Sequence, residues 1–189
     1  MPSHELPRRV VALAGVFTLA VVALGYVLLG WVPMVLFAFG FVGGFVLWLR
    51  VPSSVPFGAI RAPYFIMMAF FAAHKFEERH FGFFPALSKI TGVQAPEAGL
   101  PLGLLLYAFA MAWLLIPFLV ARRHPFGYFL AWTFFTSMGV TELAHFVFPF
   151  FTPPPLEYFP GMATVVTLAP AGWWGMSRLY QGSLLKLKS

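Results

Sequence analysis

Histidines and glutamates interrupt two otherwise apolar segments of the chain. The first reads HKFEE from His74 to Glu78, and the second reads ELAH from Glu142 to His145. Positions i, i+3 and i+4 of a helix share one face, so His74 lies with Glu77 and Glu78, and Glu142 lies with His145. Ionisable groups in hydrocarbon cost at least about 2.5 kcal/mol each and commonly mark functional sites.

Two imidazoles and three carboxylates that meet in one place predict a metal site. Di-iron carboxylate bundles use Glu-x-x-His on one helix with carboxylates from its neighbours, and the second motif has this form. The donor set suits iron, manganese or zinc better than copper(I) or calcium. The predicted metal ligands are His74, Glu77, Glu78, Glu142 and His145. Of these, Glu78 and Glu142 are the predicted catalytic carboxylates.

Other interpretations of the same residues stay open. The acidic groups can pair with the local cations Lys75 and Arg79, or a carboxylate and an imidazole can move a proton without any metal. Tyr158, at the entry to the last apolar segment, is predicted to bind the cofactor by covering the site from outside. His80 and Glu157 are open candidates, the first on another helix face and the second in a loop.

The composition identifies the elements that must position these residues. Of the 189 residues, 60% are hydrophobic, 19% are aromatic and only 10% are charged, which is typical of an integral membrane protein. The net charge of +6 comes from residues scattered at segment ends and does not predict nucleic-acid binding. Cysteine is absent, which excludes thiolate ligands. We predict an all-α transmembrane bundle in one domain, with six spans at 10–29, 34–49, 63–83, 102–120, 126–148 and 161–180.

The basic residues predict the orientation of the bundle. With the amino terminus in the cytoplasm, nine of the 12 lysines and arginines lie inside and three lie outside. Both termini are then cytoplasmic, in a bacterial inner membrane. The third and fifth spans run in the same direction, and their motifs begin roughly 17 and 24 Å from the cytoplasmic ends. Two parallel helices with ligands at similar depth can build one site in the outer half of the membrane.

Three elements in order resemble the HXXEE family of small bacterial membrane proteins. The His74–Glu78 motif has the His-x-x-Glu-Glu signature, His145 matches a later family histidine, and Tyr158-Phe-Pro-Gly161 is similar to the family's Tyr-x-Pro-Gly pattern. The family's second element is usually Asn-x-x-x-His, whereas this chain has Thr141 at the asparagine position. The family is functionally uncharacterised, so the resemblance implies a similar site and no particular activity.

The residues favour a metal-dependent oxidoreductase that acts on a lipid or isoprenoid-like substrate reaching the site from the bilayer. A metal held by carboxylates can activate oxygen or water. Fatty-acid desaturases of membranes are excluded because they need more histidines than this chain offers. One alternative is a metal-free Glu/His isomerase of apolar substrates. Another is a non-catalytic subunit that binds metal, haem or a pigment.

Overall fold

The chain forms a bundle of helices in the computed structural model, which describes residues 6–51, 53–94, 101–152 and 155–187. All regular elements in these ranges are helices, and none is a strand, so the predicted all-α class is confirmed. The α-helices are α1 (Arg8–Leu29), α2 (Trp31–Phe37), α3 (Gly43–Arg50), α4 (Phe57–His80), α5 (Phe83–Thr91), α6 (Pro101–Met111), α7 (Ile116–Ala121), α8 (Pro125–Val140) and α9 (Met162–Leu187). A π-helical turn (Ala38–Val42) joins α2 to α3, and 3-10 segments occupy Ala112–Leu115, Thr141–Phe146 and Phe148–Phe151.

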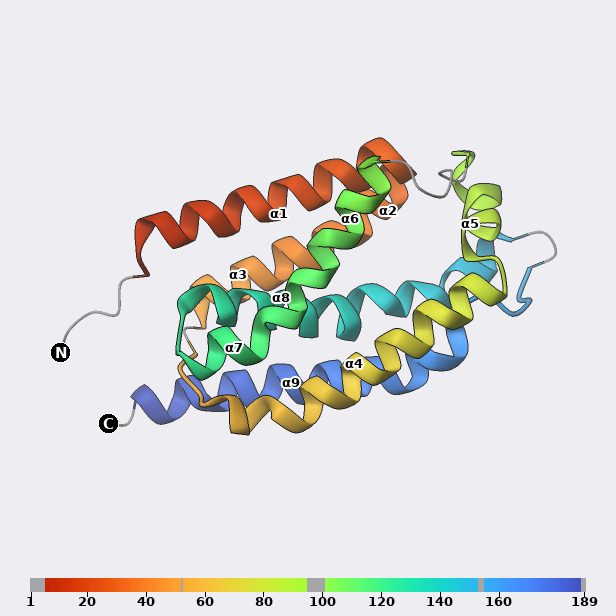
Figure 1. Cartoon of the computed structure of the whole chain (residues 1–189). Coiled ribbons are helices and arrows are strands. Elements are labelled where there is room, and N and C mark those ends of the chain that lie inside the picture. The colour runs from red at the N-terminus through yellow and green to blue at the C-terminus, as the bar shows by residue number, and fades with distance from the viewer. Residues whose placement is uncertain (1–5, 52, 95–100, 153–154, 188–189) are drawn as a thin grey trace.

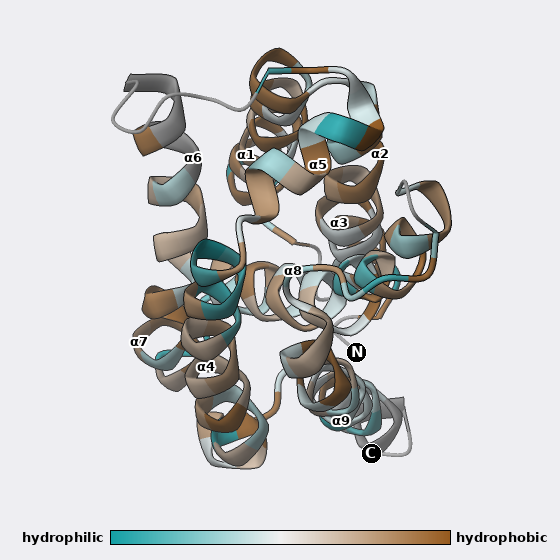
Figure 2. Cartoon of the chain, turned by 90° about the vertical axis from the view of Figure 1, so that its right-hand side faces the viewer, coloured by the Kyte–Doolittle hydropathy of each residue, from teal (hydrophilic) through white to brown (hydrophobic). Residues whose placement is uncertain are grey.

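Four helical segments within the described ranges are long and apolar enough to cross a membrane. They are Arg8–Leu29, Trp31–Arg50, Phe57–His80 and Pro125–Phe151. Many large apolar side chains are exposed, and hydrophobic residues, brown in Figure 2, occur along the helices of the bundle. These helices indicate a membrane protein, while the full set of six spans and the cytoplasmic termini stay predictions.

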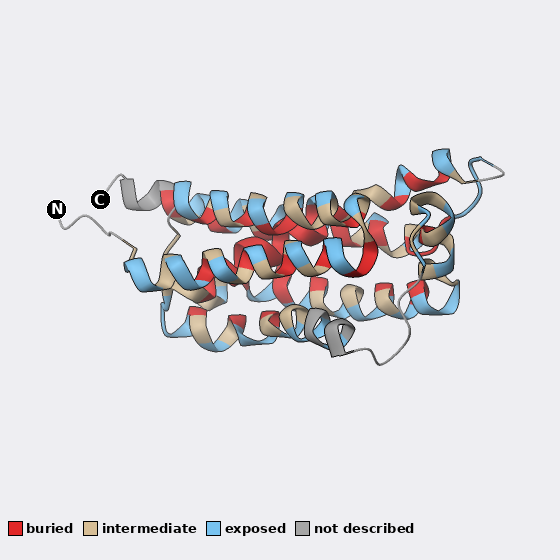
Figure 3. Cartoon of the chain, turned by 90° about the horizontal axis from the view of Figure 1, so that it is seen from above, coloured by how far each residue is buried: buried red, intermediate tan, exposed pale blue. Residues whose placement is uncertain are grey.

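Helix α8 runs through the centre of the bundle. Every residue from Gly127 to Gly139 is buried, and buried residues gather in the middle of the bundle in Figure 3. Helices α4 and α9 pack along each other, and α9 also packs on α8. In Figure 1, α4 and α8 run in the same direction, away from the end where both chain termini lie. The parallel arrangement predicted for the two motif-bearing segments is therefore present.

Glycines bring the second span close to α8. A Cβ atom on Gly44 would lie 2.6 Å from the Cα of Thr133, and one on Gly40 would lie 2.4 Å from the Oγ of Ser137. Small residues commonly mark such close contacts between membrane helices. The backbone of Thr133 cannot move aside without displacing α8.

Replacing Gly44 with alanine should therefore destabilise the bundle by about 1–3 kcal/mol, because overpacking forces the helices apart. Thermal unfolding in detergent measures the effect. Gly58→Ala is the matched control: a Cβ atom on Gly58 meets nothing within 4 Å, and the change favours the helix. If the two variants unfold at the same temperature, the close packing against Thr133 is not a determinant of stability.

Both ends of the third span differ from the sequence prediction. The third span was predicted to begin at Pro63, but α4 begins after Pro56, and Pro63 is buried inside it. A proline inside a helix loses one main-chain hydrogen bond, and tertiary packing sustains the helix here. At its other end α4 stops at His80, because Gly82 takes a left-handed conformation (φ 75°) and starts the separate helix α5.

The fifth span is also not one continuous α-helix. Regular α-helix ends at Val140, and a 3-10 segment continues from Thr141 to Phe146. The indole N–H of Trp173 donates to the carbonyl of Gly139 at 2.7 Å. An α-helix would offer that carbonyl to the N–H of residue 143, so this bond favours the change of helix type. Residues i and i+3 eclipse in a 3-10 helix, which aligns the side chains of Glu142 and His145.

Candidate metal site

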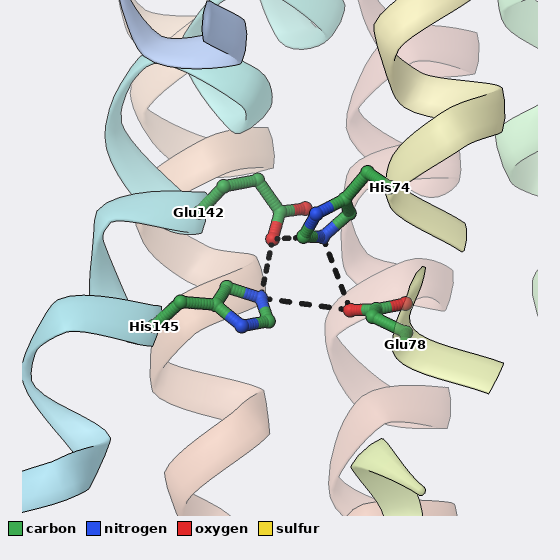
Figure 4. A group of neighbouring side chains, drawn as sticks. All are labelled: His74, Glu78, Glu142 and His145. Carbon is green, nitrogen blue, oxygen red and sulfur yellow. Dashed lines mark hydrogen bonds and ion pairs between the residues drawn. The ribbon is translucent and has the colours of Figure 1, made fainter. Parts of the chain in front are cut away.

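Four of the five predicted ligands meet between α4 and the 3-10 segment that extends α8. His74 and Glu78 are one turn apart on α4, and Glu142 and His145 come from the 3-10 segment (Figure 4). One ligand atom from each residue can be chosen so that all four lie within 4.8 Å of one another. The two motifs therefore share one site. It lies towards the end of the bundle opposite both termini, where the last turns of α4 are teal in Figure 2.

Nitrogen and oxygen atoms alternate around the centre of the cluster. Nε2 of His74 lies 3.1 Å from Oε1 of Glu78 and 3.3 Å from Oε2 of Glu142. Nε2 of His145 lies 3.5 Å and 3.1 Å from the same two oxygens. A tetrahedral ion with ligands at about 2.0–2.2 Å would need all six ligand–ligand distances to be about 3.3–3.6 Å. The four nitrogen–oxygen contacts are close to this length, while the four atoms together span up to 4.8 Å, so the ligands surround a space of the size of one ion without forming a regular tetrahedron.

The Nε2 atom of His74 is buried, and its neighbours in the described part of the chain are two carboxylate oxygens. With a protonated imidazole these contacts are ion pairs. In the neutral ring with its hydrogen on Nδ1, the lone pair of Nε2 faces both carboxylates. A metal ion between Nε2 and the carboxylates would satisfy all three groups at once.

The other nitrogen of each imidazole is held by the entry to α9. Nδ1 of His145 donates to the carbonyl of Pro160 at 2.7 Å, and Nδ1 of His74 lies 2.7 Å from Oγ1 of Thr164. Metal-binding histidines commonly use their second nitrogen in this way, which fixes the ring and turns the other nitrogen towards the ion. Gly161 lies between these partners with φ 102°, and a Cβ atom at this position would lie 2.5–2.7 Å from atoms of both rings.

Aromatic rings enclose the histidine side of the site. Phe83 of α5, Phe148 and Phe159 have ring centroids 5.3, 6.0 and 5.8 Å from that of His145. The imidazoles of His74 and His145 pack edge to face at 4.8 Å. This packing keeps water away from the rings, so charges in the cluster interact strongly.

Glu77 lies outside the cluster, in contrast to the sequence prediction. Its carboxylate accepts hydrogen bonds from the backbone N–H groups of Gly161, Ala163 and Thr164 at 3.0–3.1 Å. Positions i+3 and i+4 are about 100° apart around a helix, so Glu77 and Glu78 diverge from His74. The free N–H groups and the dipole at the start of α9 attract the anion.

Tyr158 also binds Glu77 and not the four-residue cluster. Its hydroxyl donates to Oε1 of Glu77, and its ring packs edge to face on Phe81 at 5.5 Å. Burial of the phenol and its bond to this carboxylate raise the pKa of Tyr158 to about 12. The hydroxyl therefore stays protonated at neutral pH and remains a donor. The sequence predicted that Tyr158 covers the site and binds the cofactor. In the structure, its hydroxyl binds the neighbouring Glu77.

Local cations pair with part of the cluster, as one of the open interpretations proposed. Nζ of Lys75 lies 2.6 Å from Oε2 of Glu78, which leaves Oε1 of Glu78 among the four converging atoms. Lys75 is partly exposed, and Arg79 is exposed. His80 is exposed and stacks on Phe76, while Glu157 is exposed in its loop. Neither His80 nor Glu157 is part of the cluster.

Three groups that contact the imidazoles of the site could not be identified from the two motifs alone. They are the carbonyl of Pro160, the backbone of Gly161 and the hydroxyl of Thr164. The Pro-Gly pair followed by a threonine at a helix start is the sequence signal that could have identified them.

Comparisons with protein-family models, curated proteins and solved structures found no match to the chain. The resemblance to HXXEE proteins stays a prediction from the motifs. The function of the site is therefore inferred from its geometry and chemistry alone.

Proposed function

We propose that this protein is a membrane metalloprotein that holds one divalent transition-metal ion between His74, Glu78, Glu142 and His145. One observation carries the proposal: two imidazoles and two carboxylates, largely buried, converge so that one ligand atom from each lies within 4.8 Å of the others. Two imidazoles and two carboxylates suit iron, manganese or zinc. Both Nε2 atoms face carboxylates at 3.1–3.5 Å, which favours a small ion over haem or a pigment.

The local charge supports a bound cation. The carboxylates of Glu78 and Glu142 contribute −2, and the partly exposed Lys75 contributes +1, so the cluster is net negative with neutral imidazoles. Uncompensated charge in a low-dielectric interior costs several kcal/mol. A divalent cation between the two carboxylates offsets this negative charge.

We propose that the chemistry of the site is metal-dependent and of the oxidoreductase type, with an apolar, lipid-like substrate. A bound ion of this kind supplies Lewis-acid or redox chemistry. Lipid access is supported by the exposed side chains that flank the ligands on both elements. Phe76 is 71% exposed and Val147 is 52% exposed, each two residues after a histidine of the cluster. The bacterial inner membrane, with the site in its outer half, is the proposed location.

A metal-free acid–base site is the second candidate, and one contact favours it. Both nitrogens of His145 have acceptors, with Pro160 O at 2.7 Å and Oε2 of Glu142 at 3.1 Å. A doubly protonated imidazole satisfies both contacts. Two protons, one on each histidine, would then supply the positive charge that the carboxylates require, and the site would move protons in a double-bond isomerisation.

Titration calorimetry of detergent-solubilised protein, with bound ions first removed by chelator, separates the two candidates. We expect Zn²⁺ or Mn²⁺ to bind at about one ion per chain and to displace protons from the imidazoles. Because the metal must displace any proton on the two Nε2 atoms, the apparent affinity measured from about pH 5 to about pH 8 should rise with pH, by up to about tenfold per pH unit for each proton displaced.

Heats measured in buffers of different ionisation enthalpy count these protons. Stoichiometric binding with proton release supports the metalloprotein. No binding of Zn²⁺, Mn²⁺ or Fe²⁺ at any of these pH values would overturn it and favour the acid–base site.

A further inference from the structure

The hydroxyl of Thr164 connects Glu77 to His74. Thr164 lies in the first turn of α9, and its Oγ1 is 2.7 Å from Nδ1 of His74 and 2.6 Å from Oε2 of Glu77. A third neighbour, the carbonyl of Gly161, lies 3.1 Å away. All three contacts are within hydrogen-bond distance.

The single proton of this hydroxyl determines which nitrogen of His74 carries hydrogen. The carboxylate of Glu77 and the carbonyl of Gly161 are both acceptors, so the proton of Thr164 points to one of them. A lone pair of Oγ1 then faces Nδ1 of His74, and this contact requires a hydrogen on Nδ1. In the neutral imidazole, Nε2 is left with its lone pair directed at the carboxylates of the cluster.

We infer that Thr164 is a positioning residue that fixes the ring and the tautomer of His74 for metal binding. The inference rests on the proposed metal site and goes beyond it, because Thr164 touches none of the four converging atoms. Glu77, Thr164 and His74 thus form a hydrogen-bonded relay, which begins at the carboxylate of Glu77. This carboxylate is held in place by Tyr158 and by backbone N–H groups of α9, so it keeps the proton of Thr164 directed away from His74.

The relay accounts for the arrangement of the first motif. Glu78 at i+4 contacts the cluster directly, while Glu77 at i+3 acts on the same histidine from its opposite nitrogen. When a group that hydrogen-bonds to a metal ligand is removed from a metal site, the affinity for the metal typically falls by about 10–100-fold.

The test compares Thr164→Val with Thr164→Ser. Valine keeps the shape and removes the hydroxyl, whereas serine keeps the hydroxyl. We expect the valine variant to bind Co²⁺ about 10–100-fold more weakly than the wild-type protein. The serine variant should stay within a few-fold of wild type. Thr167→Val is the matched control, because Thr167 lies one turn along α9 and makes no side-chain hydrogen bond within the described residues.

Two spectroscopic readouts separate positioning from a general loss of structure. The visible ligand-field bands of bound Co²⁺ should change in Thr164→Val and not in Thr167→Val. In addition, nitrogen NMR of histidine-labelled, metal-free wild-type protein, at a pH high enough for the imidazole of His74 to be neutral, should show His74 protonated at Nδ1. The NMR measurement needs no variant to fold.

Each outcome bears on a different statement. If the wild-type protein binds no Co²⁺, Zn²⁺ or Mn²⁺, the proposed function fails and this inference fails with it. If the wild type binds but Thr164→Val binds equally well, or if His74 carries its hydrogen on Nε2, only the role of Thr164 is overturned. Equal losses in the valine and serine variants would also overturn it, because the hydroxyl would then be irrelevant.

Discussion

Replacing His74 with alanine should abolish stoichiometric metal binding. His74 is fully buried and provides one of four converging ligand atoms. Loss of an outer partner of a metal ligand already costs about 10–100-fold in affinity, so loss of a ligand itself should cost more than about 100-fold. Elemental analysis of protein purified without chelator measures the bound ion directly. His145→Ala should give the same result, because both imidazoles face the same two carboxylates.

His80→Ala is the matched control for this experiment. His80 lies on the same helix but is exposed and stacks on Phe76 at 6.0 Å, outside the cluster. This variant should retain about one ion per chain. Glu77→Gln should also retain one ion with reduced affinity, because Glu77 acts through Thr164. If His74→Ala binds as much metal as His80→Ala, the four-residue site is wrong.

Gly161→Ala is expected to damage the site and the fold together. A Cβ atom on Gly161 would lie 2.5 Å from Cε1 and 2.6 Å from Nδ1 of His145, and 2.7 Å from Cε1 of His74. The added carbon pushes both rings away from the carboxylates and disturbs the bond from His145 to Pro160. The backbone also stays at φ 102°, a conformation that costs an L-residue about 1–2 kcal/mol. Overpacking adds about 1–3 kcal/mol.

Gly92→Ala separates the two causes. Gly92 also has a positive φ, of 70°, but a Cβ atom there meets nothing within 4 Å. Its replacement should lower the unfolding temperature through backbone strain alone and leave metal binding unchanged. Gly161→Ala should unfold at a lower temperature than Gly92→Ala and should bind the ion more weakly. Equal stability and equal metal affinity in the two variants would contradict the close contact between Gly161 and the imidazoles.

The meeting of the two motifs could be predicted from the sequence because it depends on simple periodicity. His74 and Glu78 share a helix face by their spacing, and parallel apolar segments of similar length bring Glu142 and His145 to the same depth. The bundle and its apolar surface follow from composition in the same way.

The role of Glu77 could not be predicted from that spacing. Helical periodicity gives positions i+3 and i+4 nearly equal access to the face of His74. What separates Glu77 from Glu78 is the start of α9, whose free N–H groups lie more than 80 residues further along the chain. Backbone donors leave no trace in residue types, so a carboxylate that binds them resembles a metal ligand in the sequence.

The 3-10 segment was missed for a related reason. Residues 141–146 contain nothing that prevents a regular α-helix, and the change follows from tertiary contacts. Trp173 of α9 bonds to the carbonyl of Gly139, and Thr141 donates to the carbonyl of Leu36 at 3.1 Å. Such contacts override local propensity.

The hydrogen bonds that orient both histidines set an order of events in biosynthesis. All four ligands precede Pro160 in the chain, yet the groups that hold the two Nδ1 atoms belong to Pro160 and Thr164. A nascent chain that has inserted only as far as residue 155 already contains the complete donor set with neither ring oriented. For the proposed metal site, we therefore expect loading to follow the insertion and docking of α9, when the chain is essentially complete.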